Sequence, residues 1–448
     1  MIGAKPKLFR DPVHDTIALP QDTPGDRLLI DLLDTPEVQR LRRIRQLGLT
    51  SVVYPGAEHS RFQHSLGVVW TAHEMLERLA KRTKVSDETR MLVLTGALLH
   101  DVGHGPMSHA LEAVTGIKHE RWTEALLGGP PPYPERPGAG PLAEALAAFD
   151  PSLATGVVSL YGKSPLPAGV PAFARDIVSS QLDADRLDYI LRDGHATGVR
   201  IGSYDLARIL ALLELADDHL AIHTGAQEAV EGYLLARFHM YKQVYLHKTS
   251  RAAERMLEAM LRRAGTLHRA GNPPRYWPDG PLGRLVAGQP LSPLEFATLD
   301  DSDVLFAMKA WSTDPEPGLR ALAHGLLHRE LWKPLPLHGD DARADELIHA
   351  ARAVARVKGF DPEVAVLVDT SGDSLYRPFT GPRRREGVSL QGDVDDSIRL
   401  LDSAGRMAFI EDRSEVVKML SHLQVRQRLV CVHPALREPI SRSLRLSD

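Results

Sequence analysis

Three histidines and a carboxylate occur within ten residues of this chain, and they constrain its fold more than any other feature. The segment His100–His109 reads His-Asp-Val-Gly-His-Gly-Pro-Met-Ser-His and directly follows the apolar run Met91–Leu99. An adjacent His-Asp pair at the end of a buried helix presents an imidazole and a carboxylate to one point, which suits a divalent ion such as Mn, Fe or Zn. Such a pair can equally be a polar helix end, but His104 and His109 beside it favour a metal site. The remaining ligands must then come from distant parts of the chain.

Two segments offer these ligands. Upstream, His64 opens an apolar helix; downstream, residues 182–193 form a second predicted helix with one polar and one apolar side. The polar side carries Asp185, Tyr189, Arg192 and Asp193, and the apolar side carries Leu187, Ile190 and Leu191. Alone, such a polar side would be a solvated surface. Beside a His-Asp pair, Asp185 is the natural fourth ligand.

The ordered set of His64, His100-Asp101 and Asp185 resembles the metal-binding pattern of the HD-domain phosphohydrolases. The flanking segments Arg61–Gly67, His100–His109 and Asp183–Tyr189 are similar to the branch of the deoxynucleoside triphosphate (dNTP) triphosphohydrolases. The likeness starts at Asp11-Pro12-Val13-His14, runs with gaps to about residue 335 and continues more weakly beyond it. It implies a mainly α-helical fold with an HD-type catalytic core. Because it starts so early, we expect no sterile-alpha-motif domain like that of the vertebrate enzyme.

The resemblance also implies a role for each of several residues. The metal ligands are His64, His100, Asp101 and Asp185. The catalytic residues are Arg61, His104, His109, Glu112 and His119, with His109 as the candidate general acid. The substrate-binding residues are Gln46, Leu47, Arg61, Arg186, Tyr189, Asp193, Arg237, Tyr241 and Tyr245. Glu112 replaces an aspartate of the relatives, and Arg186 replaces a lysine, which changes a point contact with phosphate into a fork.

The chemistry of these residues agrees with phosphoryl transfer. A metal held by two imidazoles and two carboxylates keeps open positions for water and a phosphate oxygen. The reaction also needs cations around the phosphate oxygens and a proton donor for the leaving oxygen. Arg61 and the predicted helix face of Arg237, Tyr241, Tyr245 and Lys248 suit a triphosphate with a base. The alternatives are a surface arginine for Arg61, core packing for the tyrosines and a loop position for His119.

Sugar selectivity follows from the same resemblance. The relatives hold the 3′-hydroxyl of the deoxyribose through residues that correspond to Gln46, Tyr189 and Asp193, with Leu47 beneath the ring. A tyrosine packed under the sugar leaves no space for a 2′-hydroxyl. We therefore expect hydrolysis of a dNTP, with Mg²⁺ on its triphosphate, to deoxynucleoside and inorganic triphosphate.

Two other functions stay open. The same metal site would serve a nucleotidase or phosphodiesterase acting on monophosphates, cyclic dinucleotides or alarmones. A nucleotide-sensing or nucleic-acid-binding protein with little catalysis is the second alternative. Arg383-Arg384-Arg385 would support it, although an arginine triplet in a polar loop is usually solvated.

Two N-terminal segments resemble the parts of relatives that bind an activating guanine nucleotide at subunit interfaces. The corresponding residues are Lys7, Leu8, Asp34, Gln39 and Arg42. A neighbouring second effector site of the vertebrate enzyme is matched less well, because Arg10 replaces its asparagine before Asp-Pro, although His247 and Lys248 remain. The alternatives are therefore activation by a single effector and no activation. Asp34 can accept hydrogen bonds from a guanine edge, and Lys7 and Arg42 can hold phosphates. Asp34-Thr35-Pro36-Glu37 is also a good helix N-cap. The resemblance implies a GTP or dGTP effector and a homo-oligomer, either a tetramer or a dimer.

Composition agrees with a cytoplasmic enzyme. The formal charge of −4 provides no general attraction to nucleic acid or membranes, and a single cysteine, Cys431, suits a reducing compartment. No run approaches 18 apolar residues, and the N-terminus lacks an apolar signal segment. We therefore expect neither a membrane nor a nucleic acid as partner.

The pattern along the chain is mostly helical up to about residue 358. We expect a helix after the N-cap Ser86, a long helix over 227–263, and loops at 128–141, 271–281 and 381–392. Beyond Phe360 the pattern changes to strands at 364–368, 397–401, 407–410 and 429–432, with a helix at 414–424. The sequence thus predicts a helical domain over 1–358 and a small α+β subdomain over 359–448.

Overall fold

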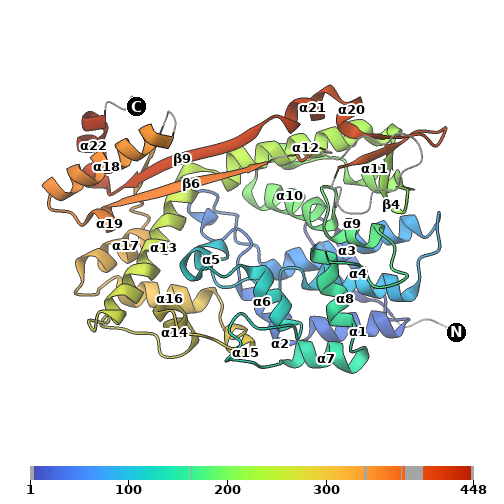
Figure 1. The fold of residues 1–448 in the computed structure, drawn as a ribbon, viewed down its shortest axis with the longest axis horizontal. Helices are drawn as coiled ribbons and strands as arrows, with labels where there is room; N and C mark the ends of the chain where they lie inside the picture. Colours follow the sequence, from blue (N-terminus) through green and yellow to red (C-terminus); the bar gives the residue numbers. More distant parts are fainter. Residues whose placement is uncertain (1–4, 163, 338–340, 375, 379–396, 445–448) are drawn as a thin grey trace.

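The computed structural model describes residues 5–162, 164–337, 341–374, 376–378 and 397–444. The described chain is mainly α-helical, with a small sheet-containing region in its C-terminal part, and this confirms the predicted fold class (Figure 1). The predicted loop at 381–392 and the arginine triplet lie outside the described residues. No helix within the described ranges has both the length and the apolar character needed to cross a bilayer.

Three helices form the centre of the part of the fold that holds the predicted metal ligands. They are α3 (Arg61–Leu79), α4 (Asp87–Leu99) and α10 (Ala184–Thr197), and their apolar faces share one core. Around them lie α1 (Pro24–Leu33), α2 (Pro36–Gln39), α5 (His109–Thr115), α6 (His119–Leu126), α7 (Pro141–Phe149), α8 (Leu153–Tyr161), α9 (Phe173–Val178) and α11 (Leu206–Ala211). The predicted loop at 128–141 is confirmed, because no helix lies between α6 and α7.

Local sequence explains where the central helices begin. Ser60 caps α3 through a reciprocal capping box with Gln63. Ser86 caps α4 as predicted, with its hydroxyl accepting from the Thr89 amide, and Asp183 caps α10 in the same way. The first turns of α3 and α10 carry His64 and Asp185, and His100-Asp101 directly follow the last turn of α4.

A second helical layer packs around α13 (Lys248–Arg269) and has its own apolar core. It contains α14 (Pro281–Ala287), α15 (Pro293–Phe296), α16 (Asp301–Trp311) and α17 (Pro317–Leu327). The predicted loop at 271–281 is confirmed between α13 and α14.

The single helix predicted over 227–263 is wrong. The chain forms α12 (Gln227–Met240), a π-helical turn (Tyr241–Tyr245) and then α13. His247 has a non-helical backbone, and its ring accepts from the Thr249 amide at 3.2 Å, so it caps the new helix. Apolar residues continue on both sides of the break, which hides it in the sequence pattern.

The described residues form three small sheets. The first is an N-terminal hairpin of β1 (Lys7–Asp11) and β2 (Asp15–Leu19). The second joins β3 (Leu213–Ala216), β4 (His219–His223), β7 (Arg399–Leu401) and β8 (Met407–Phe409). The third joins β5 (Lys333–Pro336), β9 (Gln424–Val432) and β6 (Val366–Ser374). Strands from both sides of residue 358 therefore share two sheets, and the predicted domain boundary there stays a prediction.

Two of the C-terminal strands, β6 and β9, are longer than predicted, whereas β7 and β8 are shorter than the predicted strands at 397–401 and 407–410. Residues 364 and 365 end the short helix α19 (Pro362–Ala365), and β6 then pairs with β9 in antiparallel register over nine residues. This ribbon crosses the top of the molecule above α13, from α18 (Asp341–Val357) and α22 (Arg437–Leu444) to α20 (Ile410–Arg413) and α21 (Glu415–Ser421) (Figure 1). The second half of β6 is polar in sequence, as in Asp369-Thr370-Ser371-Gly372. It therefore lacks the apolar alternation that predicts strands.

Candidate active site

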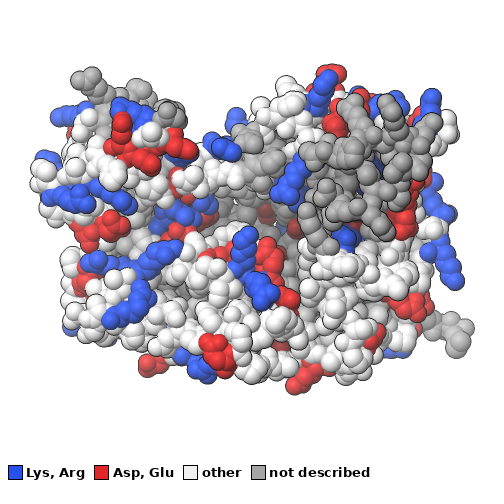
Figure 2. All heavy atoms as spheres, viewed as in Figure 1, with Lys and Arg blue, Asp and Glu red and all other residues white. Residues whose placement is uncertain are grey.

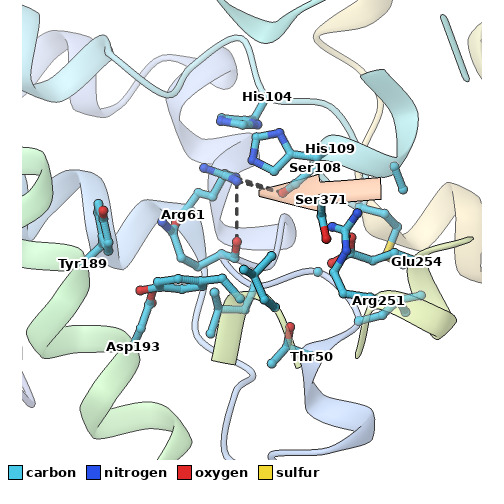
Figure 3. Close-up of a pocket in the computed structure, with 18 of the residues that line it drawn as sticks. Thr50, Arg61, His104, Ser108, His109, Tyr189, Asp193, Arg251, Glu254 and Ser371 are labelled. Atoms are coloured by element: carbon cyan, nitrogen blue, oxygen red, sulfur yellow. Dashed lines mark hydrogen bonds and ion pairs between the residues drawn. The ribbon is translucent and has the colours of Figure 1, made fainter. Parts of the chain in front are cut away.

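Most predicted catalytic and substrate residues line a cavity of about 500 Å³, whereas His64, His100 and Glu112 are not among its lining residues. Its lining includes Gln46, Leu47, Arg61, Asp101, His104, His109, His119, Asp185, Tyr189, Asp193, Tyr241 and Tyr245. In Figure 3, His104 and His109 lie on one side, Tyr189 and Asp193 on a second, and Arg251, Glu254 and Ser371 on a third. The face shown in Figure 2 is hollowed near its centre, with Lys and Arg side chains around the hollow.

Four predicted metal ligands meet at one point. His64 Nε2 lies 3.2 Å from His100 Nε2 and 3.0 Å from Asp185 Oδ1. His100 Nε2 lies 3.4 Å from Asp101 Oδ1 and 3.7 Å from Asp185 Oδ1. α3, the end of α4 and α10 thus bring residues from three separate parts of the chain together.

The far side of each imidazole is held by an acceptor. His64 Nδ1 donates to Asp188 Oδ2 at 2.8 Å, and His100 Nδ1 donates to the Ala97 carbonyl at 2.9 Å. With Nδ1 carrying the proton, each Nε2 has a lone pair to offer, which is how proteins orient metal-ligating histidines. Two imidazole nitrogens and two carboxylate oxygens fit a divalent transition ion.

The surrounding charges also favour a cation. Burial disfavours the imidazolium form of His64, yet its hydrogen bonds with Asp185 and Asp188 outweigh this and raise its pKa to about 10. Burial likewise opposes ionisation of Asp188, but Arg192, His14 and His64 hold its pKa well below the usual range. The pocket between these carboxylates therefore attracts positive charge, which a metal ion can supply.

Arg61 is tied to a metal ligand. Its side chain is 5% exposed, and its guanidinium forms an ion pair with Asp101 and donates to Ser108 Oγ at 2.9 Å. Arg61 also lines the cavity, so the alternative of a surface arginine is wrong. The segment beside it is strained, because Met107 and Ser108 have φ of 53° and 52°.

Glu112 lies at the centre of a histidine cluster. Its Oε1 lies 2.8 Å from His119 Nδ1, 3.3 Å from His109 Nδ1 and 3.8 Å from His104 Nδ1. The His104 and His119 rings stack with centroids 3.8 Å apart. The predicted pairing of His109 with Glu112 is therefore present in the structure, but His119 is the closer partner.

The histidines of this cluster differ in their preferred charge. Burial lowers the pKa of His119, but the hydrogen bond to Glu112 outweighs it and raises that pKa overall. Burial and the nearby Arg61 hold the pKa of His104 well below its usual value. The cluster thus combines a histidine that favours the cation with one that favours the neutral form, an arrangement suited to proton transfer.

The opposite side of the cavity carries hydroxyl, carboxylate and amide groups. Tyr245 Oη donates to Asp193 Oδ2 at 2.8 Å, and His59 Nε2 lies 2.8 Å from Asp193 Oδ1. The rings of Tyr189 and Tyr245 meet edge to face. Gln46 Oε1 is buried without a hydrogen-bond partner among the described residues. A buried, unpartnered amide oxygen of a residue that lines the cavity suits a hydroxyl of a bound ligand.

Two predicted substrate-binding residues, Arg186 and Arg237, are not among the residues that line the cavity. Arg186 donates to the Ser180 carbonyl and pairs with Asp183, the N-cap of its own helix. The Arg237 guanidinium lies 5.5 Å from the centroid of the Tyr241 ring. Neither is among the lining residues, so their contact with substrate stays a prediction.

The sequence analysis missed one whole wall of the cavity. Thr50, Arg251, Glu254, Ser371 and Gly372 line it, and the last two lie on β6. Arg251 binds Asp369 of the same strand, with 2.6 Å between Nη2 and Oδ1, which fastens the ribbon to α13. No local pattern indicates this contact between residues 118 positions apart.

The predicted effector residues lie at the surface. Lys7 Nζ pairs with Asp34 Oδ2 at 3.0 Å, and Arg42 Nε donates to Gln39 Oε1 at 2.8 Å. Leu8 is exposed, while His247 begins α13 beside the Tyr54 ring and Lys248 is exposed after it. Their role in effector binding stays a prediction.

Comparison with known proteins agrees with this geometry. Residues 61–129 match the HD domain family, and residues 204–270 match the HD associated region. The chain is 32% identical over 420 residues to the protein YwfO of Bacillus subtilis, covering 93% of this chain and 89% of that protein. A solved phosphohydrolase structure from Bacteroides thetaiotaomicron superposes with a TM-score of 0.78 at 31% identity, covering 96% of this chain and 100% of that one.

The named triphosphohydrolases are more distant. The deoxynucleoside triphosphate triphosphohydrolase SAMHD1 of Gallus gallus is 28% identical over 355 residues, which cover 73% of this chain and 55% of the chicken protein. This chain thus spans about half the length of that relative. Together with the HD ligand set, the family match and the phosphohydrolase structure at 31% identity show that the chain belongs to the HD-domain phosphohydrolases.

Proposed function

We propose that this protein hydrolyses dNTPs at the α-phosphorus and releases deoxynucleoside and inorganic triphosphate. The observation that supports this most directly is the division of one cavity into a metal-ligand cluster, a histidine–glutamate cluster and a tyrosine–aspartate side. These parts match the needs of a reacting phosphorus, a leaving group and a sugar. The relationship to the SAMHD1 enzymes supports the same substrate class.

Each part of the cavity has a task in this proposal. A divalent ion held by His64, His100, Asp101 and Asp185 would lower the pKa of an attacking water and offset charge on the phosphate, while Mg²⁺ would accompany the triphosphate. His109 and His119 lie beside Glu112 and can donate to a leaving oxygen or bind phosphate oxygens. Asp193 and Gln46 have acceptor oxygens for the 3′-hydroxyl.

Product analysis tests this function. We expect purified protein, incubated with each dNTP and with Mn, Fe, Zn or Mg, to release intact tripolyphosphate and deoxynucleoside. Release of orthophosphate or of a nucleoside monophosphate would instead indicate the nucleotidase or phosphodiesterase alternative. Full biological function in a variant without the His100-Asp101 pair would indicate a sensor.

Tyr189 is expected to distinguish deoxynucleotides from ribonucleotides. Its ring lines the cavity beside Asp193, and burial raises the pKa of its phenol well above the usual value, so the group stays neutral. Tyr189→Ala opens space for a 2′-hydroxyl and should reduce the preference for dGTP over GTP by about tenfold or more. The ratio of kcat/KM values for the two nucleotides measures this.

Tyr189→Phe is the matched control for that experiment. It keeps the ring and removes only the hydroxyl, so the preference for dGTP should persist if the ring excludes the 2′-hydroxyl. Equal hydrolysis of dGTP and GTP by the wild-type protein would contradict the assignment.

We further propose that a guanine nucleotide activates the protein and promotes a dimer or tetramer. Lys7 and Asp34 pair at the surface, and a bound nucleotide can replace that contact by offering phosphates to Lys7 and a base edge to Asp34. GTP or dGTP should increase both dNTP turnover and the mass measured by light scattering. Asp34→Ala should lose both responses, whereas Asp31→Ala, an exposed acid one turn earlier, should retain them. If added GTP or dGTP changes neither the dNTP turnover rate nor the molecular mass of the wild-type protein, this regulation is excluded.

A further inference from the structure

Asp188 sits at the centre of a buried network directly behind the metal ligands. It lies on α10, three residues after Asp185, and its side chain is fully buried. Its Oδ2 accepts from His64 Nδ1 at 2.8 Å and from Arg192 Nε at 2.8 Å. Its Oδ1 accepts from Arg192 Nη2 at 2.9 Å and from His14 Nε2 at 2.6 Å. Four donors thus occupy both carboxylate oxygens.

The fourth donor comes from outside the helical core. His14 lies in the turn between β1 and β2, 174 residues away from Asp188 in the chain, and its side chain is 6% exposed. Asp11 shapes that turn by accepting from the amides of Val13 at 2.9 Å and His14 at 3.0 Å. Asp11 also binds Arg192 Nη1 at 2.8 Å, so the turn is docked onto α10 through two contacts.

We infer that His14 is a positioning residue for the metal site and that docking of the N-terminal hairpin is coupled to metal binding. This inference rests on the metal site proposed above. A carboxylate with all its acceptor positions filled cannot rotate without losing a hydrogen bond to a buried donor. Asp188 therefore stays aimed at His64 Nδ1, and His64 keeps its Nε2 lone pair directed at the ion.

The space around the network supports a requirement for fixed geometry. Gly67 on α3 faces Asp188 and Arg192, and a Cβ built on it would lie 1.9 Å from Asp188 Oδ1 and 2.4 Å from Arg192 Nη2. Arg192 bridges Asp11 and Asp188, so the docked turn and the carboxylate behind His64 share one buried guanidinium.

Coupling of this kind works in both directions. If the docked hairpin favours the metal-binding geometry of His64, then metal binding must favour the docked hairpin by the same factor. Purely structural packing of His14 would not produce this reciprocity. Hairpin mobility in the wild-type protein therefore reports on the proposal without any substitution.

The first experiment measures metal affinity by competition with a chelator, using Mn²⁺ and Co²⁺. We expect His14→Ala to weaken binding by about 10- to 100-fold, the usual effect of losing a partner behind a metal ligand. His14→Gln should restore most of the affinity, because its amide Nε2 can take the place of the imidazole Nε2 as donor. The visible spectrum of the Co²⁺-loaded protein should change in His14→Ala and return in His14→Gln.

His219→Ala is the matched control. His219 also connects a strand to a helical carboxylate, with Nδ1 2.9 Å from Asp176 Oδ2, but Asp176 does not contact a predicted metal ligand in the described structure. Metal affinity in His219→Ala should equal that of the wild type. Unchanged affinity and an unchanged Co²⁺ spectrum in His14→Ala would overturn the inference.

The second experiment measures hydrogen exchange of the β1–β2 amides in the wild-type protein. Saturating Mn²⁺ should slow their exchange, whereas exchange in α14, in the second helical layer, should not change. If metal binds but hairpin exchange stays the same, the coupling is wrong while the metal site stands. If no metal binds, the proposed metal site itself fails. Neither readout depends on dNTP hydrolysis.

Discussion

Asp185→Ala is expected to abolish stable metal binding and to lower dNTP turnover by at least about a thousandfold. Loss of metal catalysis removes several kcal/mol of transition-state stabilisation, and about 4 kcal/mol corresponds to a factor of 10³. Asp185 is 32% exposed and pairs with no arginine in the described structure. Its removal therefore leaves no buried guanidinium without an ion-pair partner. Elemental analysis and tripolyphosphate release measure the two effects.

The paired substitution His100→Ala with Asp101→Ala tests the same site from α4. It should also abolish metal content and turnover, but it removes the partner of the buried Arg61 and should therefore destabilise the protein by about 3–5 kcal/mol. Circular dichroism separates that loss of stability from loss of metal. His195→Ala, an exposed histidine on the same helix as Asp185, is the control and should retain both metal and activity. Stoichiometric metal in the double variant would show that the site assignment is wrong.

Glu112→Gln is expected to lower kcat by about 10²- to 10³-fold, the range typical of impaired proton transfer. The substitution keeps the size of the side chain but removes the charge that His109 and His119 share. Glu112 raises the pKa of His119, so its neutralisation lowers that pKa. Because a proton donor must be protonated, activity falls as pH rises through its pKa. The alkaline limb of the rate profile should therefore move to lower pH in Glu112→Gln.

Glu124→Gln is the control for that substitution. Glu124 lies on α6, pairs with Arg121 at the surface and does not contact the histidine cluster in the described structure. Its pH profile should match the wild type. An unchanged alkaline limb in Glu112→Gln would contradict the proposed role of the cluster.

Much of the helical framework and of the candidate site was predictable because its signals are local. Ser86 and Asp183 cap α4 and α10 through residues three positions later. Apolar periodicity placed the helices, and the motif order His64, His100-Asp101, Asp185 indicated the ligands that the structure brings together. The break at the π-helical turn was missed because apolar residues continue through it.

Contacts between distant segments had no such signal. The polar second half of β6 forms a strand because it pairs with β9. It borders the cavity because Arg251 binds Asp369 and so holds the strand against α13. His14 appeared in the sequence only as part of a motif, and its contact with Asp188 emerged from the docking of the hairpin.

The sequence by itself determined the helical class, the start of α4 at Ser86 and the four side chains predicted as metal ligands, since each depends on residue type and short-range spacing. Only the tertiary structure decided that β6 lines one wall of the cavity and that Asp188 holds His64 in place. The physical reason is that a hydrogen bond between residues such as His14 and Asp188 depends on how whole elements pack, and one chain's local pattern carries no record of that packing.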